Sequence, residues 1–454
     1  MTFNDFYNRI RYYLDGNNMK SRRIKLKKEW HDRRSRKILK RKSKNRIKKI
    51  TKHNNDVSHV IGAESLNYFF NKGFKKKIST SKKIELTAPR IFAMDENVDE
   101  TLEFLKKVIY AVTRNTTKSL FIDYSKIEKI SLSASLILDL ILMDAQKYAY
   151  ENRYGEKFEI TGKLNDKSDI SVLLKANGFI PHLGFDVKKD DDVVSLDFVR
   201  GKAEVEDNED AASKILIYFK DCIKKHKYEL TREAEVKFAK LLGEVIDNCT
   251  LHPGENGRWY ALGFYHHKGD RGICHIAIVS LGRTIYESFK KSELSDEMRK
   301  GLSDKYKMHA KYFDDNWNEE TLYTWLSLQN GVSRMRDSKV EENSNRGVGT
   351  VDMMESFQTI GKGMGKYKPI FNIVSGNASI NFDFDQYPIE TMERSGDKHK
   401  IITFNKEKSL DFKPDNKNVY INKNYFPGTI FTMEFCIDPK YLENSKQGYL
   451  RRND

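Results

Sequence analysis

A carboxylate and a carboxamide stand four residues apart in the segment 234–254, at Glu244 and Asn248. The apolar residues of this segment recur at helical spacing and are Phe238, Leu241, Leu242, Val245 and Ile246. This pattern predicts an amphipathic helix, on which positions four apart lie one turn apart on the same face. An amide oxygen in such a pair can ligate Mg²⁺, and a carboxylate can orient or deprotonate water. Taken alone, the pair could equally belong to a solvated helix surface.

Three later stretches place glycine beside strand or helix patterns. The first, SLGRT at 280–284, follows an apolar strand predicted at 275–279. The second, RGVG at 346–349, precedes the helical pattern VDMMESF, and the third, GT at 428–429, belongs to an alternating strand. Glycine lets backbone N–H groups approach a phosphate closely, and a helix that follows presents its N-terminal N–H groups.

In this order, the landmarks resemble the Bergerat nucleotide-binding fold of the GHKL ATPases, which include DNA gyrase, heat-shock chaperones and histidine kinases. EVIDN at 244–248 matches the N box E-x-x-D-N, GVG at 347–349 matches the second glycine box, and GTIF at 428–431 matches the final G-T-x-F strand. The resemblance implies ATP and Mg²⁺ as cofactors, Glu244 as general base and Asn248 as the Mg²⁺ ligand. The residues that it places around the nucleotide are Asp247, Asn248, Ser280, Gly282, Thr284, Arg346, Gly347, Val348, Gly349 and Thr429.

The first glycine box departs from the family pattern D-x-G-x-G. Ser280 stands where the family has the aspartate that accepts a hydrogen bond from the adenine amino group, and Thr284 replaces the second glycine. We therefore expect only a small preference for ATP over GTP. The segment between the boxes, at about 286–344, takes the position of the family's ATP lid and carries helical patterns in SDEMRKGLSDKYKMHAKYF and EETLYTWLSLQNGVSRM. A lid that closes over nucleotide converts binding into a conformational signal.

The segment 81–200 alternates strand and helix patterns. Strands are predicted at 119–127 and 157–162 and helices at 130–152 and 170–179, which implies a mixed or parallel sheet with helices packed on it. The pattern resembles a STAS domain, the module of bacterial anti-sigma-factor antagonists. In that family a D-S-S-G motif begins the central helix, and its second serine can be phosphorylated. Ser133 takes this place, although Ser131 and Ala134 replace the aspartate and the glycine. Ser133 is therefore either an ordinary helix N-cap or a regulatory site.

The net charge of +16 comes from one segment. Residues 20–52 contain 18 Lys and Arg against two acidic residues, so the remaining 421 residues are neutral. Such a dense run of cations binds phosphates well, because the release of counterions favours the complex without reading the sequence. A solvated arm, an anionic membrane surface and an acidic protein partner are the alternatives. The predicted nucleic-acid contacts are Arg22, Arg23, Lys27, Lys28, Arg33, Arg34, Arg36, Lys37, Lys40, Arg41 and Lys42.

The fold class is predicted as α/β (α+β), in five parts. These are a basic N-terminal extension at 1–80, a STAS-like βαβ domain at 81–200, a linker at 201–210, a GHKL ATPase-like α/β sandwich at 211–438 and a polar tail at 439–454. The chain has no run of 18 apolar residues and no secretory signal, and its four cysteines form no CxxC pair. We therefore expect a cytoplasmic protein without a membrane span or a disulfide scaffold.

These features favour a GHKL-type switch protein that binds ATP with Mg²⁺, hydrolyses it and signals through lid closure to a protein partner or to nucleic acid. One alternative is a scaffold or sensor whose GHKL-like site no longer uses ATP, which Ser280 favours. Another is a serine kinase of the anti-sigma-factor type, with Ser133 as its substrate. The combination of modules suggests a role in bacterial stress response or phage defence. The sequence leaves the oligomeric state open, a homo-oligomer included.

Overall fold

The structure is a computed structural model of the chain, and it combines helices and strands as the α/β prediction requires. The residues that it describes are 64–70, 82–113, 117–152, 158–164, 169–177, 190–202, 208–251, 257–268, 271–291, 296–329, 368–394, 397–438 and 450–452. No helix among these residues is long and apolar enough to cross a membrane. The basic segment 20–52 lies outside the described residues.

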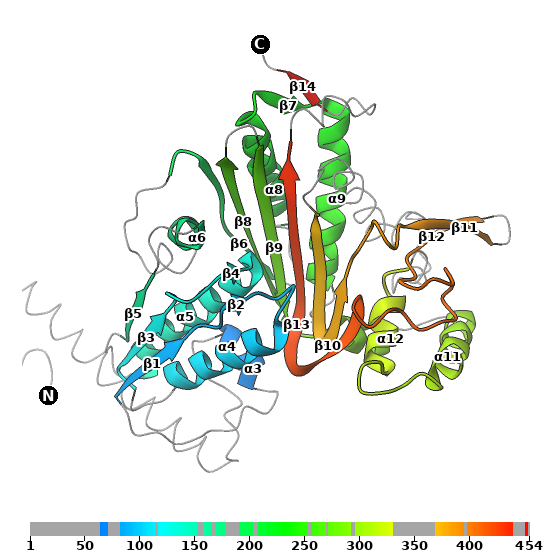
Figure 1. Ribbon diagram of the computed structural model, residues 1–454, viewed down its shortest axis with the longest axis horizontal. Helices are drawn as coiled ribbons and strands as arrows, with labels where there is room; N and C mark the ends of the chain where they lie inside the picture. Colours follow the sequence, from blue (N-terminus) through cyan, green and yellow to red (C-terminus); the bar gives the residue numbers. More distant parts are fainter. Residues whose placement is uncertain are drawn as a thin grey trace, which may run out of the picture.

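A five-stranded antiparallel sheet with the order β10-β13-β9-β8-β6 forms the centre of the molecule (Figure 1). Its strands are β6 (Val193–Lys202), β8 (Arg258–Lys268), β9 (Arg271–Leu281), β10 (Ile370–Asn381) and β13 (Val419–Ile437). Strands β8 and β9 form an antiparallel hairpin. Apolar residues fill both faces of β9, because the sheet is covered on both sides.

The pairing between β10 and β13 is interrupted at one point along the two strands. The first half of β10, up to Ser375, pairs with β13 from Thr429 onward, whereas its second half pairs with residues 419–421. Gly376 lies at the break with a φ of 63°, a conformation that glycine adopts without strain. The break at Gly376 therefore divides β10 into two halves with different pairing.

The N-terminal layer contains a three-stranded parallel sheet with the order β1-β3-β5, so β3 is central. Its elements are α3 (Glu64–Phe70), β1 (Lys83–Thr87), β2 (Ile91–Phe92), α4 (Val98–Thr113), β3 (Ser119–Asp123), β4 (Lys129–Ile130), α5 (Leu132–Asn152), β5 (Glu159–Lys163) and α6 (Asp169–Asn177). Each connection β1-α4-β3 and β3-α5-β5 is a parallel crossover that steps in the same direction. Right-handed crossovers of this kind place both helices on one face of the small sheet.

Helix α5 lies between the two sheets. It contacts β8, β9 and β13 of the large sheet, and its first eleven residues, 132–142, are all buried. A helix that is enclosed on every side needs apolar residues all round, which explains the run LSASLILDLIL. The buried residues of α5 share one cluster with Leu120 and Ile122 of β3 and with Leu262 and Val279 of the large sheet. The N-terminal layer and the large sheet therefore have a continuous hydrophobic core.

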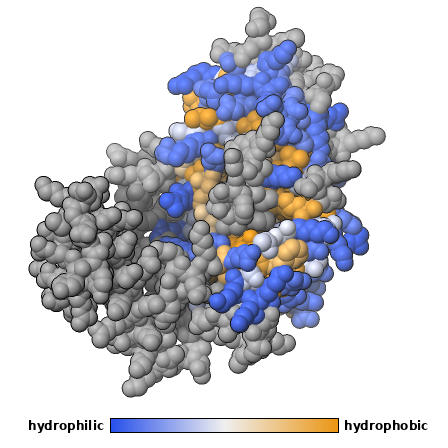
Figure 2. All heavy atoms as spheres, turned by 90° about the vertical axis from the view of Figure 1, so that its left-hand side faces the viewer, coloured by the Kyte–Doolittle hydropathy of each residue, from blue (hydrophilic) through white to orange (hydrophobic). Residues whose placement is uncertain are grey.

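The opposite face of the large sheet is covered by α8 (Asn208–Lys224), α9 (Arg232–Leu251), α10 (Ile285–Lys290) and α12 (Glu319–Leu326). The remaining elements are α11 (Asp296–Ala310) and the strand pairs β7 (Tyr228–Leu230) with β14 (Leu450–Arg452) and β11 (Glu390–Arg394) with β12 (Asp397–Ile401). On the side of the molecule seen in Figure 2, the described surface is mainly hydrophilic and apolar residues show in separate patches. Among the described residues, the large apolar side chains that are exposed are Ile217, Val236, Tyr306, Met308 and Phe412.

The structure revises three of the predicted boundaries. Strand β6, which the prediction gave largely to the STAS-like domain, is the edge strand of the large sheet, because it pairs with β8 from Val193 to Lys202. The predicted linker 201–210 is partly regular, since β6 ends at Lys202 and α8 begins at Asn208. The predicted tail contains β14, which pairs with β7. These pairings join residues far apart in sequence, so local composition did not reveal them.

The described part of the predicted lid, 286–291 and 296–329, is packed against the rest of the molecule. Trp317 and Trp325 are fully buried in the same core as the sheet residues Ile373 and Phe371. Trp325 donates a hydrogen bond from Nε1 to the carbonyl of Ile402 at 3.0 Å. Helices α10 and α12 are therefore a fixed layer in this conformation, and the rest of the predicted lid lies outside the described residues.

Candidate functional site

Helix α9 carries the predicted N box and confirms the helix expected at 234–254. Its residues Leu242, Val245, Ile246 and Cys249 are buried in the core that covers one face of the large sheet. The side chains of Glu244, Asp247 and Asn248 lie outside the described part of the helix. The predicted phosphate loop, Arg346 to Gly349, also lies outside the described residues. The structure therefore describes one half of the predicted site, the residues of β9, of β13 and at the start of α10.

A ladder of three hydroxyl groups crosses this end of the sheet. Ser280 of β9 and Thr429 of β13 are direct cross-strand partners, and Thr429 is in turn paired with Ser375 of β10. Thr429 Oγ1 lies 2.9 Å from Ser375 Oγ, and Ser280 Oγ donates to the carbonyl of Thr429 at 3.4 Å. All three side chains are 3% exposed or less. Each stands two positions from a residue of the same core, Ile278, Phe431 or Ile373, so all three lie on the face of the sheet that α8, α9, α10 and α12 cover.

Two glycines allow the backbone to close around this ladder. Gly428 has a φ of 150°, and a Cβ atom at this position would lie 1.9 Å from the carbonyl oxygen of Ser280. Gly282 has a φ of 137°, and its N–H donates to the carbonyl of Pro427 at 3.1 Å. Gly428 is therefore required by the close approach of β9 and β13, and Gly282 is favoured by its backbone conformation.

Thr284 has a structural role that the glycine-box comparison did not predict. It is the N-cap of α10: its hydroxyl accepts from Glu287 N at 3.0 Å, and Glu287 Oε2 accepts from Thr284 N at 3.1 Å. The sequence signal for this capping box is the spacing T-x-x-E at 284–287. Thr284 is fully buried and its N–H is bonded to Glu287, so this residue offers neither side chain nor N–H to a ligand in this conformation.

Ser375 is a residue of this region that the sequence reasoning missed. Its Oγ accepts from the N–H of Ile285, the first residue of α10, at 2.9 Å while it also contacts Thr429. Ser375 thereby ties α10 to the corner of β10 and β13. No motif marks it in the sequence, because its role depends on three segments that are distant along the chain.

Ser133 lies on the opposite face of the large sheet. It is fully buried, and its Oγ lies 2.7 Å from Thr432 Oγ1 of β13 and 3.0 Å from Ser131 Oγ. The N-cap of α5 is Ser131, whose Oγ accepts from Ala134 N at 3.3 Å and from Met94 N at 3.0 Å. The capping role considered for Ser133 therefore belongs to Ser131. A phosphate could reach Ser133 only if α5 separated from the sheet.

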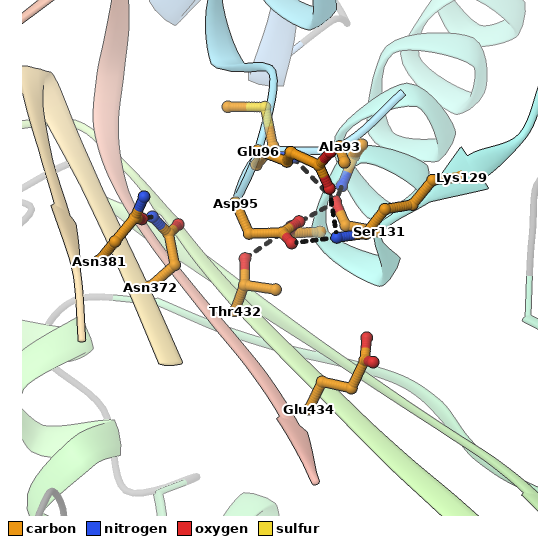
Figure 3. A network of polar contacts seen from close by, with 12 residues as sticks. Ala93, Asp95, Glu96, Lys129, Ser131, Asn372, Asn381, Thr432 and Glu434 are labelled. Carbon is orange, nitrogen blue, oxygen red and sulfur yellow. Dashed lines mark hydrogen bonds and ion pairs between the residues drawn. The ribbon is translucent and has the colours of Figure 1, made fainter. Parts of the chain in front are cut away.

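An ion-pair network borders this interface (Figure 3). Lys129 Nζ lies 2.8 Å from Asp95 Oδ2 and 2.8 Å from Glu96 Oε2. Partial burial acts to lower the pKa of Lys129, but the two carboxylates outweigh it and the pKa is raised above its ordinary value. Lys129 therefore stays protonated and holds the start of α5 against the loop that precedes α4.

No family model, curated protein or solved structure matches the chain significantly. Within the described ranges, no group of three or more His, Cys, Asp or Glu side chains has an arrangement that could hold a metal ion.

Proposed function

We propose that the chain is a GHKL-type protein that binds ATP with Mg²⁺ between α9 and the end of β9 and β13. The GHKL resemblance supplies the roles: Asn248 for Mg²⁺, Glu244 for the attacking water, and Gly347 and Gly349 for the phosphates. ATP hydrolysis and the use of this site as a conformational switch belong to the same proposal.

The observation that carries the proposal is the pairing of Ser280 with Thr429. Two separate motif matches, 149 residues apart, place these residues beside the adenine. In the structure they are cross-strand partners on the face of the sheet against which α9 packs. Motifs that matched by chance would have no reason to meet at one point of the fold.

The site assignment is tested with two valine substitutions on β13. Thr429→Val removes the hydroxyl that contacts Ser375 on the α9 face, and Thr432→Val removes the one that contacts Ser133 on the other face. Both threonines are buried, so each variant should lose about 1 kcal/mol of unfolding free energy. Only Thr429→Val should weaken Mg²⁺–ATP binding in a calorimetric titration. Equal ATP affinities in both variants would show that the nucleotide does not bind at this face.

The Mg²⁺ role is tested separately with Asn248→Ala. This change removes the proposed ligand, so ATP affinity should fall in the presence of Mg²⁺ and become insensitive to EDTA. If wild type and Asn248→Ala bind ATP equally with Mg²⁺ and with EDTA, the N-box assignment is wrong.

If the protein hydrolyses ATP, Glu244→Gln should slow phosphate release by about 10²- to 10⁴-fold, because glutamine keeps the shape but cannot accept the proton. ATP binding should persist. A Glu244→Gln variant with full turnover would remove Glu244 from the mechanism.

The second candidate function is a non-catalytic scaffold or sensor with the same fold. Ser280 favours it, because a neutral hydroxyl already engaged with Thr429 reads an adenine less well than a carboxylate would. This candidate predicts ATP binding without phosphate release. The anti-sigma-factor kinase receives less support, since Ser133 is buried against Thr432 in this conformation.

A further inference from the structure

A short segment of β13, Asn422 to Tyr425, is hydrogen-bonded to the N-terminal layer through Asn424. Asp99, in the first turn of α4, accepts a hydrogen bond at Oδ1 from Asn424 N at 2.8 Å, and its carbonyl accepts from Asn424 Nδ2 at 3.1 Å. Lys106, two turns further along α4, donates from Nζ to Asn424 Oδ1. Asn424 is thus bonded to α4 through its backbone and through both ends of its amide.

The next residue, Tyr425, is hydrogen-bonded to α10, which lies on the opposite face of the large sheet. Tyr425 donates from its hydroxyl to Glu287 Oε1 at 3.1 Å. The second oxygen of the same carboxylate closes the N-terminus of α10 by accepting from Thr284 N. A movement of Tyr425 would therefore act directly on the capping box of α10.

The same segment is tied to the corner of β10. Asn377 donates from Nδ2 to the carbonyl of Asn422 at 2.9 Å, and Glu320 of α12 accepts from Asn377 N at 2.9 Å. Both α4 and α12 contact β13, whose lower bend lies between them in Figure 1. Three residues beyond Tyr425, the strand reaches Gly428 and the hydroxyl ladder at Thr429. The chain of contacts thus leads from α4 around the sheet to the candidate nucleotide site.

We propose that residues 422–425 couple the position of α4 in the N-terminal layer to the N-terminus of α10 beside the nucleotide site. A ligand or partner that displaces α4 would then alter the site through Asn424, Tyr425 and Glu287, and occupancy of the site would alter α4 in return, because coupling is reciprocal. The regulatory meaning of this coupling rests on the proposed nucleotide site. The mechanical coupling itself does not.

The coupling is tested in nucleotide-free, full-length protein by amide hydrogen exchange of residues 285–291. Lys106→Ala removes one of the three α4 hydrogen bonds to Asn424, and Tyr425→Phe removes only the hydroxyl that contacts Glu287. Each should raise the exchange rates of 285–291, on the order of 5-fold. The double variant should fall short of the product of the two effects, because both act on one chain of contacts.

Lys107→Ala is the matched control. Lys107 is the exposed neighbour of Lys106 on α4, so its removal should leave 285–291 unchanged. Asn424→Ala provides a second perturbation, which should act like Lys106→Ala but more strongly. The coupling is rejected if Lys106→Ala and Asn424→Ala match the Lys107→Ala control in 285–291, or if Lys106→Ala and Tyr425→Phe multiply as independent changes.

A second measurement distinguishes a failure of this inference from a failure of the proposed function. Mg²⁺–ATP affinity is measured for the same variants. If wild-type protein binds ATP, Lys106→Ala and Tyr425→Phe should change its affinity and Lys107→Ala should not; unchanged affinities would restrict the contacts to a structural role and reject the regulation. If wild-type protein binds no ATP, the proposed function fails, while the exchange experiment still decides the coupling.

Discussion

At the scale of single residues, glycine has opposite roles at two positions near the candidate site. Gly428 occupies a left-handed region of backbone space where a Cβ atom would lie 1.9 Å from a carbonyl oxygen. Gly243 lies inside α9, next to Glu244, and a Cβ atom at this position would lie in open space. Glycine is therefore required at the first position and costs helix stability at the second.

These roles predict effects of opposite sign for the same substitution. Gly428→Ala should lower the free energy of unfolding by more than about 2 kcal/mol, since strained backbone and a backbone clash add together. Gly243→Ala should raise it by about 0.5–1 kcal/mol, because alanine is the better helix former. Urea unfolding of both variants measures the two changes. A stable Gly428→Ala protein would mean that β9 and β13 do not approach as closely as described.

At the scale of elements, the buried residues among the described side chains of α11 are Leu302 and His309, and His309 is titratable. His309 is fully buried against Trp317 and Trp325, with ring centroids 5.6 and 5.8 Å away, and its Nε2 lies 3.0 Å from the carbonyl of Leu410. The charged groups around it are Lys305, Asp411 and Lys311. Burial lowers the pKa of His309 below its ordinary value of 6.5, so the neutral ring is the form that packs.

This pKa shift predicts a loss of stability in mild acid. The unfolded chain binds the proton more readily than the folded one, so the contribution of His309 is complete above pH 6.5 and declines as the pH falls below it. Urea unfolding between pH 5 and 8 should show this decline, and His309→Leu should reduce it. An identical pH profile in the His309→Leu variant would assign the decline to other groups.

At the scale of the whole molecule, the N-terminal layer and the large sheet are interdependent. Leu262, Ala277, Val279 and Ile430 of the sheet are fully buried in the cluster shared with α5. Removal of the N-terminal layer would expose this apolar face to water, and exposed apolar surfaces of that kind promote aggregation.

A chain of residues 190–454 should therefore be insoluble or bind the dye ANS strongly. A chain of residues 53–454, which retains the N-terminal layer, should behave like the full-length protein. Sedimentation and ANS fluorescence of the two chains test this difference. A monomeric 190–454 chain with a cooperative unfolding transition would show that the two layers are separate domains after all.

The basic segment at residues 20–52 carries the net charge of the whole molecule, and we propose that it contacts nucleic acid through phosphates. The logarithm of affinity should fall with the logarithm of salt concentration, with a slope near −0.9 per duplex phosphate neutralised or about −0.7 for single strands. Fluorescence anisotropy should show weak sequence dependence, and deletion of residues 1–52 should abolish binding. Unchanged binding after the deletion, or none at about 50 mM salt, would instead favour an acidic protein partner.

The sequence by itself determined much of the local structure. Helices α5, α9 and α11 and strands β3 and β5 were predicted close to their bounds, because apolar periodicity is a short-range signal. The strand patterns covered only part of β9 and β13, and the helical pattern that begins at Glu319 continued past Leu326, where α12 ends. The motif order also selected Ser280 and Thr429, although nothing in the sequence shows that they are cross-strand partners.

Only the tertiary structure decided which of these elements belong together. It assigned β6 to the large sheet, enclosed α5 between two sheets, moved the α5 cap from Ser133 to Ser131 and brought Ser375 to Thr429. These contacts join segments that are up to 299 residues apart, as Ser133 and Thr432 are. Local propensity carries no information about such pairs, because they form only when whole faces of helices and sheets are buried against one another.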